Sequence, residues 1–352
     1  MIARHAIAVP LWLALVSTVP AQVRVVTALP EAAVPLLEAR LEAAGVAAEI
    51  ERRPTSVLWA QAQAGDVAAD LLAGVDAEVV EQATVPWVPA PLPDGSAVQP
   101  FWIGASDRYL VPWAVPWVAV WRAGRVAPAR VPRRIGQWIE FEGRIVLAAP
   151  QAAPSLFGAV FLDRFRSLNR DHVFGWLRAL DAAAAGYAET PEAVLSDLDG
   201  AVPAVAFALR FDVERARGAG ADLLWSADVA PFPVVQGLAV ALATEGPEVL
   251  EARDALLDAT LALRLATEFG IVPGLRDPDD LPARILAELP AVRHWRPTPG
   301  PLARWIAEWE VEVRGKGGLT ERLDRWLGFA FAFVFVAVLW FVHREMKRER
   351  SA

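Results

Sequence analysis

Residues 64–77 read AGDVAADLLAGVDA and contain the end of one helix, a complete strand and the start of the next helix. Gly65 is typical of a helix C-terminus, because glycine adopts the left-handed conformation without a steric cost. Residues 70–75 (DLLAGV) contain a short apolar run after Asp70, which is typical of a buried strand. Asp76 follows this run and has the side chain of a helix N-cap, so we expect a helix over residues 77–83.

The chain before this segment has the same order of elements. Residues 23–27 (VRVVT) are rich in β-branched side chains and predict a strand, and residues 31–44 have apolar positions at helical spacing. Residues 46–52 predict a second strand, and Ser56 has the side chain to cap a helix over residues 57–64. Three successive strand–helix units predict an α/β fold with parallel strands and crossover helices.

These units together resemble the first lobe of type 2 periplasmic solute-binding proteins. The similarity continues in residues 135–150, which resemble the family's W-x-D-L…G-K-I-x-L-x-x-P segment, and in residues 199–207 and 233–274. Within the last of these stretches we expect one helix over residues 247–268. The branch that the sequence resembles includes iron(III), thiamine, polyamine and phosphonate binders of ABC importers. The resemblance covers roughly residues 22–310 and implies two doubly wound mixed sheets joined by a hinge.

The same resemblance implies a domain organisation. Lobe 1 is expected to comprise about residues 22–112 and 226–310, and lobe 2 about residues 113–225. Residues 311–325 include RGKGG at positions 314–318 and are interpreted as a linker.

Both ends of the chain indicate export and membrane attachment. Residues 326–342 are apolar and uncharged, and a transmembrane helix needs about 17–25 such residues, so we expect one here rather than a buried core helix. The basic tail at 343–352 is expected to be cytoplasmic. Residues 1–21 resemble a signal peptide, with an uncleaved anchor as the alternative. The sequence therefore predicts a single-pass protein of the cytoplasmic (inner) membrane, with its body in the periplasm or outside.

Composition excludes several classes of function. The chain has no cysteine, which excludes thiol catalysis and cysteine-based metal sites. Its formal net charge is −8, and part of its basic charge lies in the signal and tail, so an acidic body argues against nucleic-acid binding. The motifs G-x-S-x-G and H-E-x-x-H and the phosphate-binding loop do not occur in the sequence. We therefore expect a protein that is not an enzyme and has no cofactor or metal site.

Hydroxyl side chains at predicted helix N-termini are the first candidates for ligand binding. Unpaired backbone N–H groups there favour anions. Ser56, Ser155 and Thr190 lie at such positions, and Thr27 ends the first strand. The alternative for each helix position is a simple N-cap, and the resemblance implies that Thr27 and Ser155 lie in the cleft.

Phe207 and two charged residues complete the predicted ligand site. Arg210 has the planar guanidinium that binds carboxylates or phosphonates, with an ion pair to Asp212 or Glu214 as the alternative. Asp76 is a candidate partner for a cationic ligand, or only a helix cap. The resemblance implies that Phe207 lies in a strand that lines the cleft.

Two aromatic features bear on the ligand class. In the iron-binding branch of the family that the sequence resembles, adjacent tyrosines from the region that corresponds to residues 207–211 hold the metal. Residues 207–211 contain no tyrosine, so ferric binding by a tyrosine pair is not expected. Several tryptophans are candidates for an aromatic cleft wall, with core packing as the alternative: Trp59, Trp87, Trp102, Trp113 and Trp117.

The sequence leaves two functional hypotheses. The first is a membrane-tethered solute-binding protein that delivers a small anion, metal complex or organic cation to an ABC permease in the same membrane. The alternative is a sensor or assembly subunit that binds a partner protein. A cleft that is filled by the protein's own side chains would favour the alternative.

Overall fold

The computed structural model describes residues 22–199, 202, 204–227, 234–293 and 295–315. The predicted signal peptide (1–21), transmembrane segment (326–342) and basic tail (343–352) lie outside these residues. Within the described ranges, none of the helices has both the length and the apolar composition that a membrane span requires.

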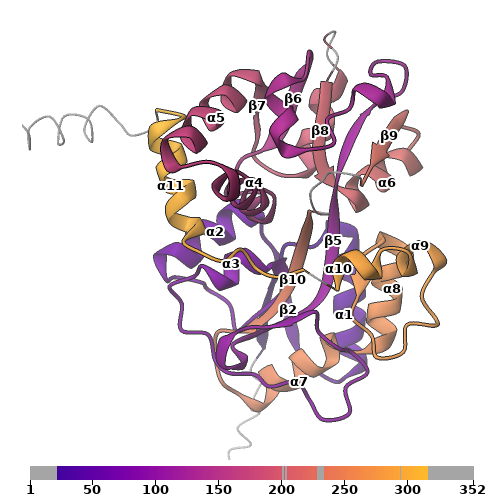
Figure 1. Cartoon of the computed structure of the whole chain (residues 1–352). Helices are drawn as coiled ribbons and strands as arrows, with labels where there is room; N and C mark the ends of the chain where they lie inside the picture. Colours follow the sequence, from indigo (N-terminus) through magenta and orange to yellow (C-terminus); the bar gives the residue numbers. More distant parts are fainter. Residues whose placement is uncertain (1–21, 200–201, 203, 228–233, 294, 316–352) are drawn as a thin grey trace, which may run out of the picture.

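Lobe 1 contains the predicted alternation of strands and helices (Figure 1). Its sheet has the order β2-β1-β3-β10, in which the first three strands are parallel and β10 is antiparallel to β3. The strands are β1 (Val23–Thr27), β2 (Ala48–Arg52), β3 (Leu71–Asp76) and β10 (Val235–Leu242). The helices are η1 (Glu31–Ala33), α1 (Val34–Ala43), α2 (Thr55–Ala64), α3 (Ala77–Glu81), α7 (Pro247–Leu256) and α8 (Ala259–Phe269).

Two local predictions in lobe 1 were wrong. Residues 247–268 were expected to form one helix, but Asp258 has an extended backbone and caps α8 by accepting hydrogen bonds from two backbone N–H groups, which divides the segment. Ser56 was expected to cap α2, but α2 begins at Thr55 after Pro54, so Ser56 lies in the first turn. Proline fixes the backbone dihedral that precedes the helix and therefore determines where it starts.

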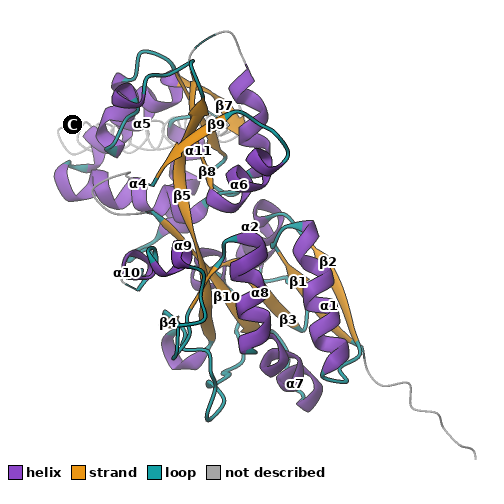
Figure 2. Cartoon of the chain, turned by 90° about the vertical axis from the view of Figure 1, so that its right-hand side faces the viewer, coloured by secondary structure: helices purple, strands orange, loops and turns teal. Residues whose placement is uncertain are grey.

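A single long strand, β5 (Tyr109–Arg122), passes through both lobes (Figure 2). Its first half pairs with β10 in the sheet of lobe 1, and its second half pairs with β8 and β9 in lobe 2. The lobe 2 strands are β6 (Arg144–Ala148), β7 (Ala184–Ala188), β8 (Ala204–Leu209) and β9 (Leu223–Ser226). The lobe 2 helices are η3 (Pro128–Arg130), η4 (Ile135–Glu140), α4 (Pro154–Ser167), α5 (Arg170–Ala183), η5 (Glu192–Asp199) and α6 (Arg210–Gly218).

The last helix of the described residues, α11 (Leu302–Glu312), packs on lobe 2, against α4 and α5 (Figure 1). The predicted boundary placed residues up to 310 in lobe 1. The difference arises because two tryptophans of α11 pack against aromatic rings of lobe 2. The distance between ring centroids is 4.9 Å for Trp305 and Phe165, and 5.8 Å for Trp309 and Phe157. Residues 295–301, which we call the connecting segment, carry the chain from lobe 1 to α11.

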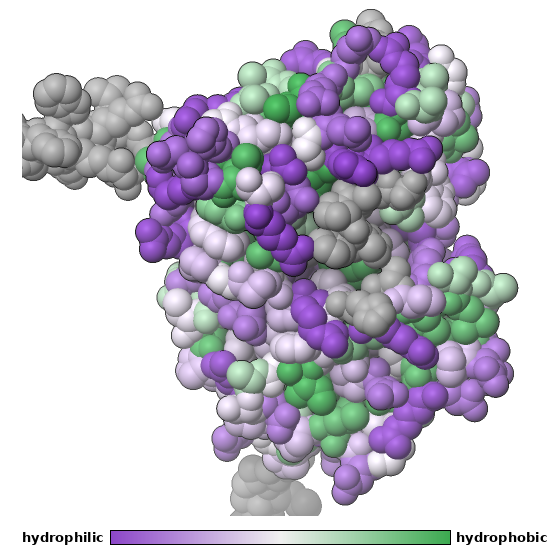
Figure 3. Space-filling view, viewed as in Figure 1, coloured by the Kyte–Doolittle hydropathy of each residue, from purple (hydrophilic) through white to green (hydrophobic). Residues whose placement is uncertain are grey.

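Short elements complete lobe 1 around β5. They are β4 (Trp102–Ile103), η2 (Ala105–Asp107), β11 (Val272–Pro273), α9 (Ala283–Leu286) and α10 (Leu289–Val292), and β4 and β11 pair with β5. Of the five tryptophans that were candidates for a cleft wall, four are buried in the core: Trp59, Trp87, Trp113 and Trp117. On the face shown in Figure 3, hydrophilic residues predominate on both lobes and the hydrophobic residues form small separate areas.

Candidate functional site

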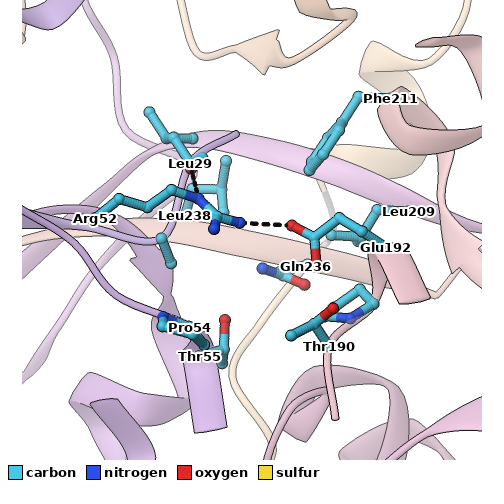
Figure 4. Close-up of a pocket in the computed structure, with 12 residues that line it drawn as sticks. Leu29, Arg52, Pro54, Thr55, Thr190, Glu192, Leu209, Phe211, Gln236 and Leu238 are labelled. Carbon is cyan, nitrogen blue, oxygen red and sulfur yellow. Dashed lines mark hydrogen bonds and ion pairs between the residues drawn. The ribbon is translucent and has the colours of Figure 1, made fainter. Parts of the chain in front are cut away.

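A small pocket lies between the two lobes, where the parallel strands of lobe 1 end (Figure 4). Arg52 and Thr55 line it from lobe 1, Thr190 and Glu192 line it from lobe 2, and Gln236 contributes from β10. The cavity volume is about 20 Å³. A water molecule needs about 10–15 Å³ of such space, so the pocket has room for about one water molecule in this arrangement of the lobes.

An ion pair between Arg52 and Glu192 closes this pocket from one lobe to the other. The Arg52 Nη2 atom lies 2.7 Å from Glu192 Oε1, and Arg52 Nε donates to the carbonyl oxygen of Leu29 at 2.8 Å (Figure 4). The two charged side chains are 28% and 26% exposed, so both are partly shielded from water. The pair therefore connects the end of β2 in lobe 1 to η5 in lobe 2.

A second contact between the lobes joins Asp76 to Ser155. Asp76 ends β3 and caps α3, and its Oδ2 accepts hydrogen bonds from the Ser155 hydroxyl at 2.9 Å and the Ser155 backbone N–H at 3.3 Å. Trp117 on β5 donates its indole N–H to the same hydroxyl. Ser155 lies in the first turn of α4, where unpaired N–H groups favour an anion. The carboxylate of Asp76 occupies that position.

The buried carboxyl group of Glu78 extends this network to the connecting segment. Glu78 Oε1 accepts from the Thr298 backbone N–H at 2.6 Å and from the Thr298 hydroxyl at 2.7 Å. Burial raises the pKa of Asp76 to about 6, and burial together with the nearby charge of Asp76 raises the pKa of Glu78 to about 8. The network therefore links α3, α4 and the connecting segment through two carboxyl groups that ionise near neutral pH.

Comparisons with known proteins identify the architecture. The sequence matches no protein-family model and no curated protein. Iron-bound HitA from Pseudomonas aeruginosa has a similar structure, with a TM-score of 0.67 and 14% sequence identity over 84% of this chain and 99% of that one. The fold is that of the two-lobed periplasmic binding proteins. The predicted fold class is thereby confirmed for the bilobed body.

Two further solved structures share this binding-protein fold. The periplasmic binding protein AfuA from Actinobacillus pleuropneumoniae, with exogenous fructose-6-phosphate bound, has a TM-score of 0.66 and 13% identity over 83% of this chain and 98% of that one. A protein described as a two-component system protein mediating signal transduction has a TM-score of 0.65 and 14% identity over 81% of this chain and 99% of that one. At these identities the similarity establishes the fold alone.

Within the binding-protein fold, the predicted hydroxyl residues occupy different environments. Thr27 is fully buried, and its hydroxyl accepts a hydrogen bond from the Leu29 backbone N–H at 3.1 Å. Ser56 lies in the first turn of α2, next to Thr55, which lines the pocket. Ser155 is buried against Asp76, and Thr190 lines the pocket.

Phe207 and Arg210 do not line the pocket. Phe207 is fully buried in lobe 2, with its ring stacked 4.0 Å from that of Trp138. Arg210 is 1% exposed, donates to the carbonyl oxygen of Gly270 and forms ion pairs with Glu288 and, at 3.8 Å, Glu214. Burial lowers the pKa of Arg210. Its guanidinium therefore joins α6 of lobe 2 to the C-terminal part of lobe 1.

The two tyrosines of the chain do not line the pocket either. The Tyr109 hydroxyl donates to Glu81, and Tyr187 packs against Trp309 of α11. In the part of the chain that the structure describes, no three His, Cys, Asp or Glu side chains are grouped so that they could hold a metal ion.

Arg52 and Glu192 were not among the predicted site residues. A signal for Arg52 existed, since it ends β2 and pairs in register with Thr27, which ends β1. In parallel sheets the carboxyl ends of the strands form the ligand crevice. Glu192 follows Thr190 closely, but only the folded chain shows that it meets Arg52.

The buried carboxyl group of Glu78 predicts a pH-dependent stability. Its pKa rises from 4.5 to about 8 on folding, so the folded protein holds a proton that the unfolded chain has lost. The resulting stabilisation is complete below pH 4.5 and is lost as the pH rises to about 8. We expect the Tm of the wild-type chain to fall between about pH 5 and pH 8, and the Glu78→Gln variant to show a flatter profile. The exposed variant Glu142→Gln should keep the wild-type slope, and an unchanged slope in Glu78→Gln would contradict the assignment.

Proposed function

We propose that the protein is an extracytoplasmic solute-binding protein that holds a small ligand between its lobes and delivers it to an ABC importer. The observation that carries this proposal is the polar pocket between the lobes of a binding-protein fold. Its polar groups include the Arg52 guanidinium, the hydroxyls of Thr55 and Thr190, and the Gln236 amide. A few polar groups in a mainly apolar pocket are typical of small-molecule sites. HitA and AfuA, whose structures are similar, hold iron and a sugar phosphate respectively.

Ligand entry requires the lobes to separate around β5. Separation would break the Arg52–Glu192 ion pair and the hydrogen bonds from Ser155 to Asp76. A ligand that replaces these contacts binds the closed form more tightly than the open form and shifts the population towards closure. The contacts between the lobes thus set the free energy that the ligand must supply.

Membrane attachment is part of the proposal. The described chain continues beyond α11 on lobe 2, and the apolar residues 326–342 begin shortly afterwards. Residues 1–21 would direct export, and residues 326–342 would anchor the body on the outer side of the cytoplasmic membrane, with the basic tail inside. Tethering would raise the local concentration of the binding protein at a permease in the same membrane.

A second candidate function is a sensor or assembly subunit that binds a partner protein. The observation that favours it is the small cavity, about 20 Å³, between lobes that are joined by the protein's own side chains. In this function the closed body itself would be the surface that a partner recognises.

Native mass spectrometry of the full-length chain, purified in mild detergent from its own host, distinguishes the two functions. A transport role predicts a bound small molecule that is lost in the Arg52→Gln variant. Arg53→Gln is the matched control, because Arg53 is the next residue and pairs with Glu51 within lobe 1. An empty protein that retains a partner protein and shows no thermal shift with iron, phosphonates, polyamines or thiamine would favour the second function.

A further inference from the structure

The charges of the pocket are divided between the lobes. On the lobe 1 side, the Arg52 guanidinium lies beside the first turn of α2, a ten-residue helix whose N-terminal residue Thr55 also lines the pocket. A guanidinium and a helix N-terminus both favour an anion. The lobe 1 wall is therefore suited to an anionic group.

The lobe 2 wall has the opposite character. The Glu192 carboxylate faces the pocket from η5. Asp212 at the start of α6 is also buried. Its Oδ1 accepts a hydrogen bond from Arg215 at 3.0 Å, and its Oδ2 has no hydrogen-bond partner among the described residues. Asp212 is close enough to Glu192 for the charge of Glu192 to add to the effect of burial in raising the pKa of Asp212. The Glu192 carboxylate on this side favours a cationic group.

The small cavity restricts how a ligand can bind. At a distance of 2.7 Å, Arg52 and Glu192 leave no space between them, so a ligand larger than water must separate the two side chains. A neutral ligand would leave two partly buried charges without partners. A simple anion would pair with Arg52 but face the Glu192 carboxylate, and a simple cation would do the reverse. Only a ligand with both charges replaces both partners.

We infer that the ligand of the pocket is a small zwitterion, whose anionic group binds Arg52 and whose cationic group binds Glu192. This inference rests on the proposed solute-binding function. The hydroxyls of Thr55 and Thr190 and the Gln236 amide would supply further hydrogen bonds on the two sides.

Titration calorimetry on the full-length chain in detergent tests the inference with matched ligands. The first set is γ-aminobutyrate, butyrate and butylamine, and the second is 2-aminoethylphosphonate, ethylphosphonate and ethylamine. The two sets distinguish a carboxylate from a phosphonate as the anionic group. In at least one set, the zwitterion should bind about tenfold or more tightly than either singly charged analogue, since each analogue leaves one partly buried charge unpaired.

Charge-neutral variants should change the selectivity rather than only the affinity. In Glu192→Gln the simple anion should bind more tightly than it does to the wild type, and the preference for the zwitterion should disappear. Arg52→Gln should favour the simple cation instead. The matched control is Glu142→Gln, which removes an exposed carboxylate of the same lobe, 78% exposed and paired with Arg130, and should leave all ratios unchanged. A variant with a folding defect would instead bind all the ligands more weakly and keep the ratios between their affinities.

The outcomes separate this inference from the proposed function. If a singly charged analogue binds as tightly as its zwitterion, or if Glu192→Gln keeps the wild-type ratios, the zwitterion inference is wrong while solute binding stands. If no ligand of either set binds and no small molecule co-purifies with the chain, the proposed function itself fails, and the inference fails with it.

Discussion

Replacement of Asp76 with alanine is expected to lower the free energy of unfolding by about 3 kcal/mol and to separate the lobes. The side chain accepts three hydrogen bonds, from the Glu78 backbone N–H and from the backbone and hydroxyl of Ser155. Each buried donor that loses its acceptor costs about 1–3 kcal/mol. Burial of the Asp76 carboxylate is itself unfavourable and raises its pKa to about 6. Removal of this buried charge therefore offsets part of the cost. Denaturant unfolding measures the stability, and small-angle scattering measures the separation of the lobes.

Two control variants isolate the contact between the lobes. Asp258 is the N-cap of α8, and its side chain pairs with Arg40 in the same lobe. Asp258→Ala should lower the free energy of unfolding by about 1 kcal/mol without changing the scattering profile. Asp76→Asn keeps an acceptor oxygen and should fall between the two alanine variants. If Asp76→Ala is no less stable than Asp258→Ala and scatters like the wild type, the bond to Ser155 contributes nothing to closure.

Two glycine-to-alanine substitutions in neighbouring helices of lobe 2 are expected to have opposite effects. A Cβ atom at Gly158 on α4 would lie 3.2 Å from Thr298 Cβ and closer still to the Thr298 hydroxyl. Thr298 cannot easily move, because Glu78 binds both its backbone N–H and its hydroxyl. Overpacking of this kind costs about 1–3 kcal/mol, so Gly158→Ala should be destabilised despite the better helix propensity of alanine.

Gly175 on α5 provides the matched control for this substitution. Its Cβ would meet no atom within 4 Å, so Gly175→Ala should be neutral or stabilised by about 0.5–1 kcal/mol. Hydrogen exchange should show faster exchange of α11 in Gly158→Ala only, because displacement of the connecting segment loosens the helix that follows it. Equal stability and equal exchange in the two variants would show that the connecting segment does not hold α11 in place.

The alternation of strands and helices in lobe 1 was predictable because it follows from neighbouring residues. The β-branched residues 23–27, the glycine at position 65 and the capping carboxylate of Asp76 act within a few positions of themselves. The start of α2 and the break between α7 and α8 were missed for an equally local reason. At both places the residue that sets the helix boundary, Pro54 or Asp258, lies close to other polar residues that could also set it. Only the backbone of the folded chain shows which residue does so.

The candidate site was predictable only in part. Asp76 and Ser155 were both predicted site residues, and the fold brings them together, but each takes the other as its partner. Arg210 was predicted to bind a ligand, yet its guanidinium lies against Glu288 and Gly270, residues distant in the sequence. A side chain's chemistry is visible in the sequence, whereas its partner is not.

The sequence by itself determined the α/β class, the order of the elements of lobe 1 and the types of residue at the strand ends, because these depend on local spacing and backbone preferences. The tertiary structure alone decided that α11 packs on lobe 2, that Asp76 reaches the first turn of α4, and that Arg52 meets Glu192. The last two contacts join residues 79 and 140 positions apart in the chain. Such pairs depend on how two lobes close around β5, which is a property of the whole packed chain and not of any segment.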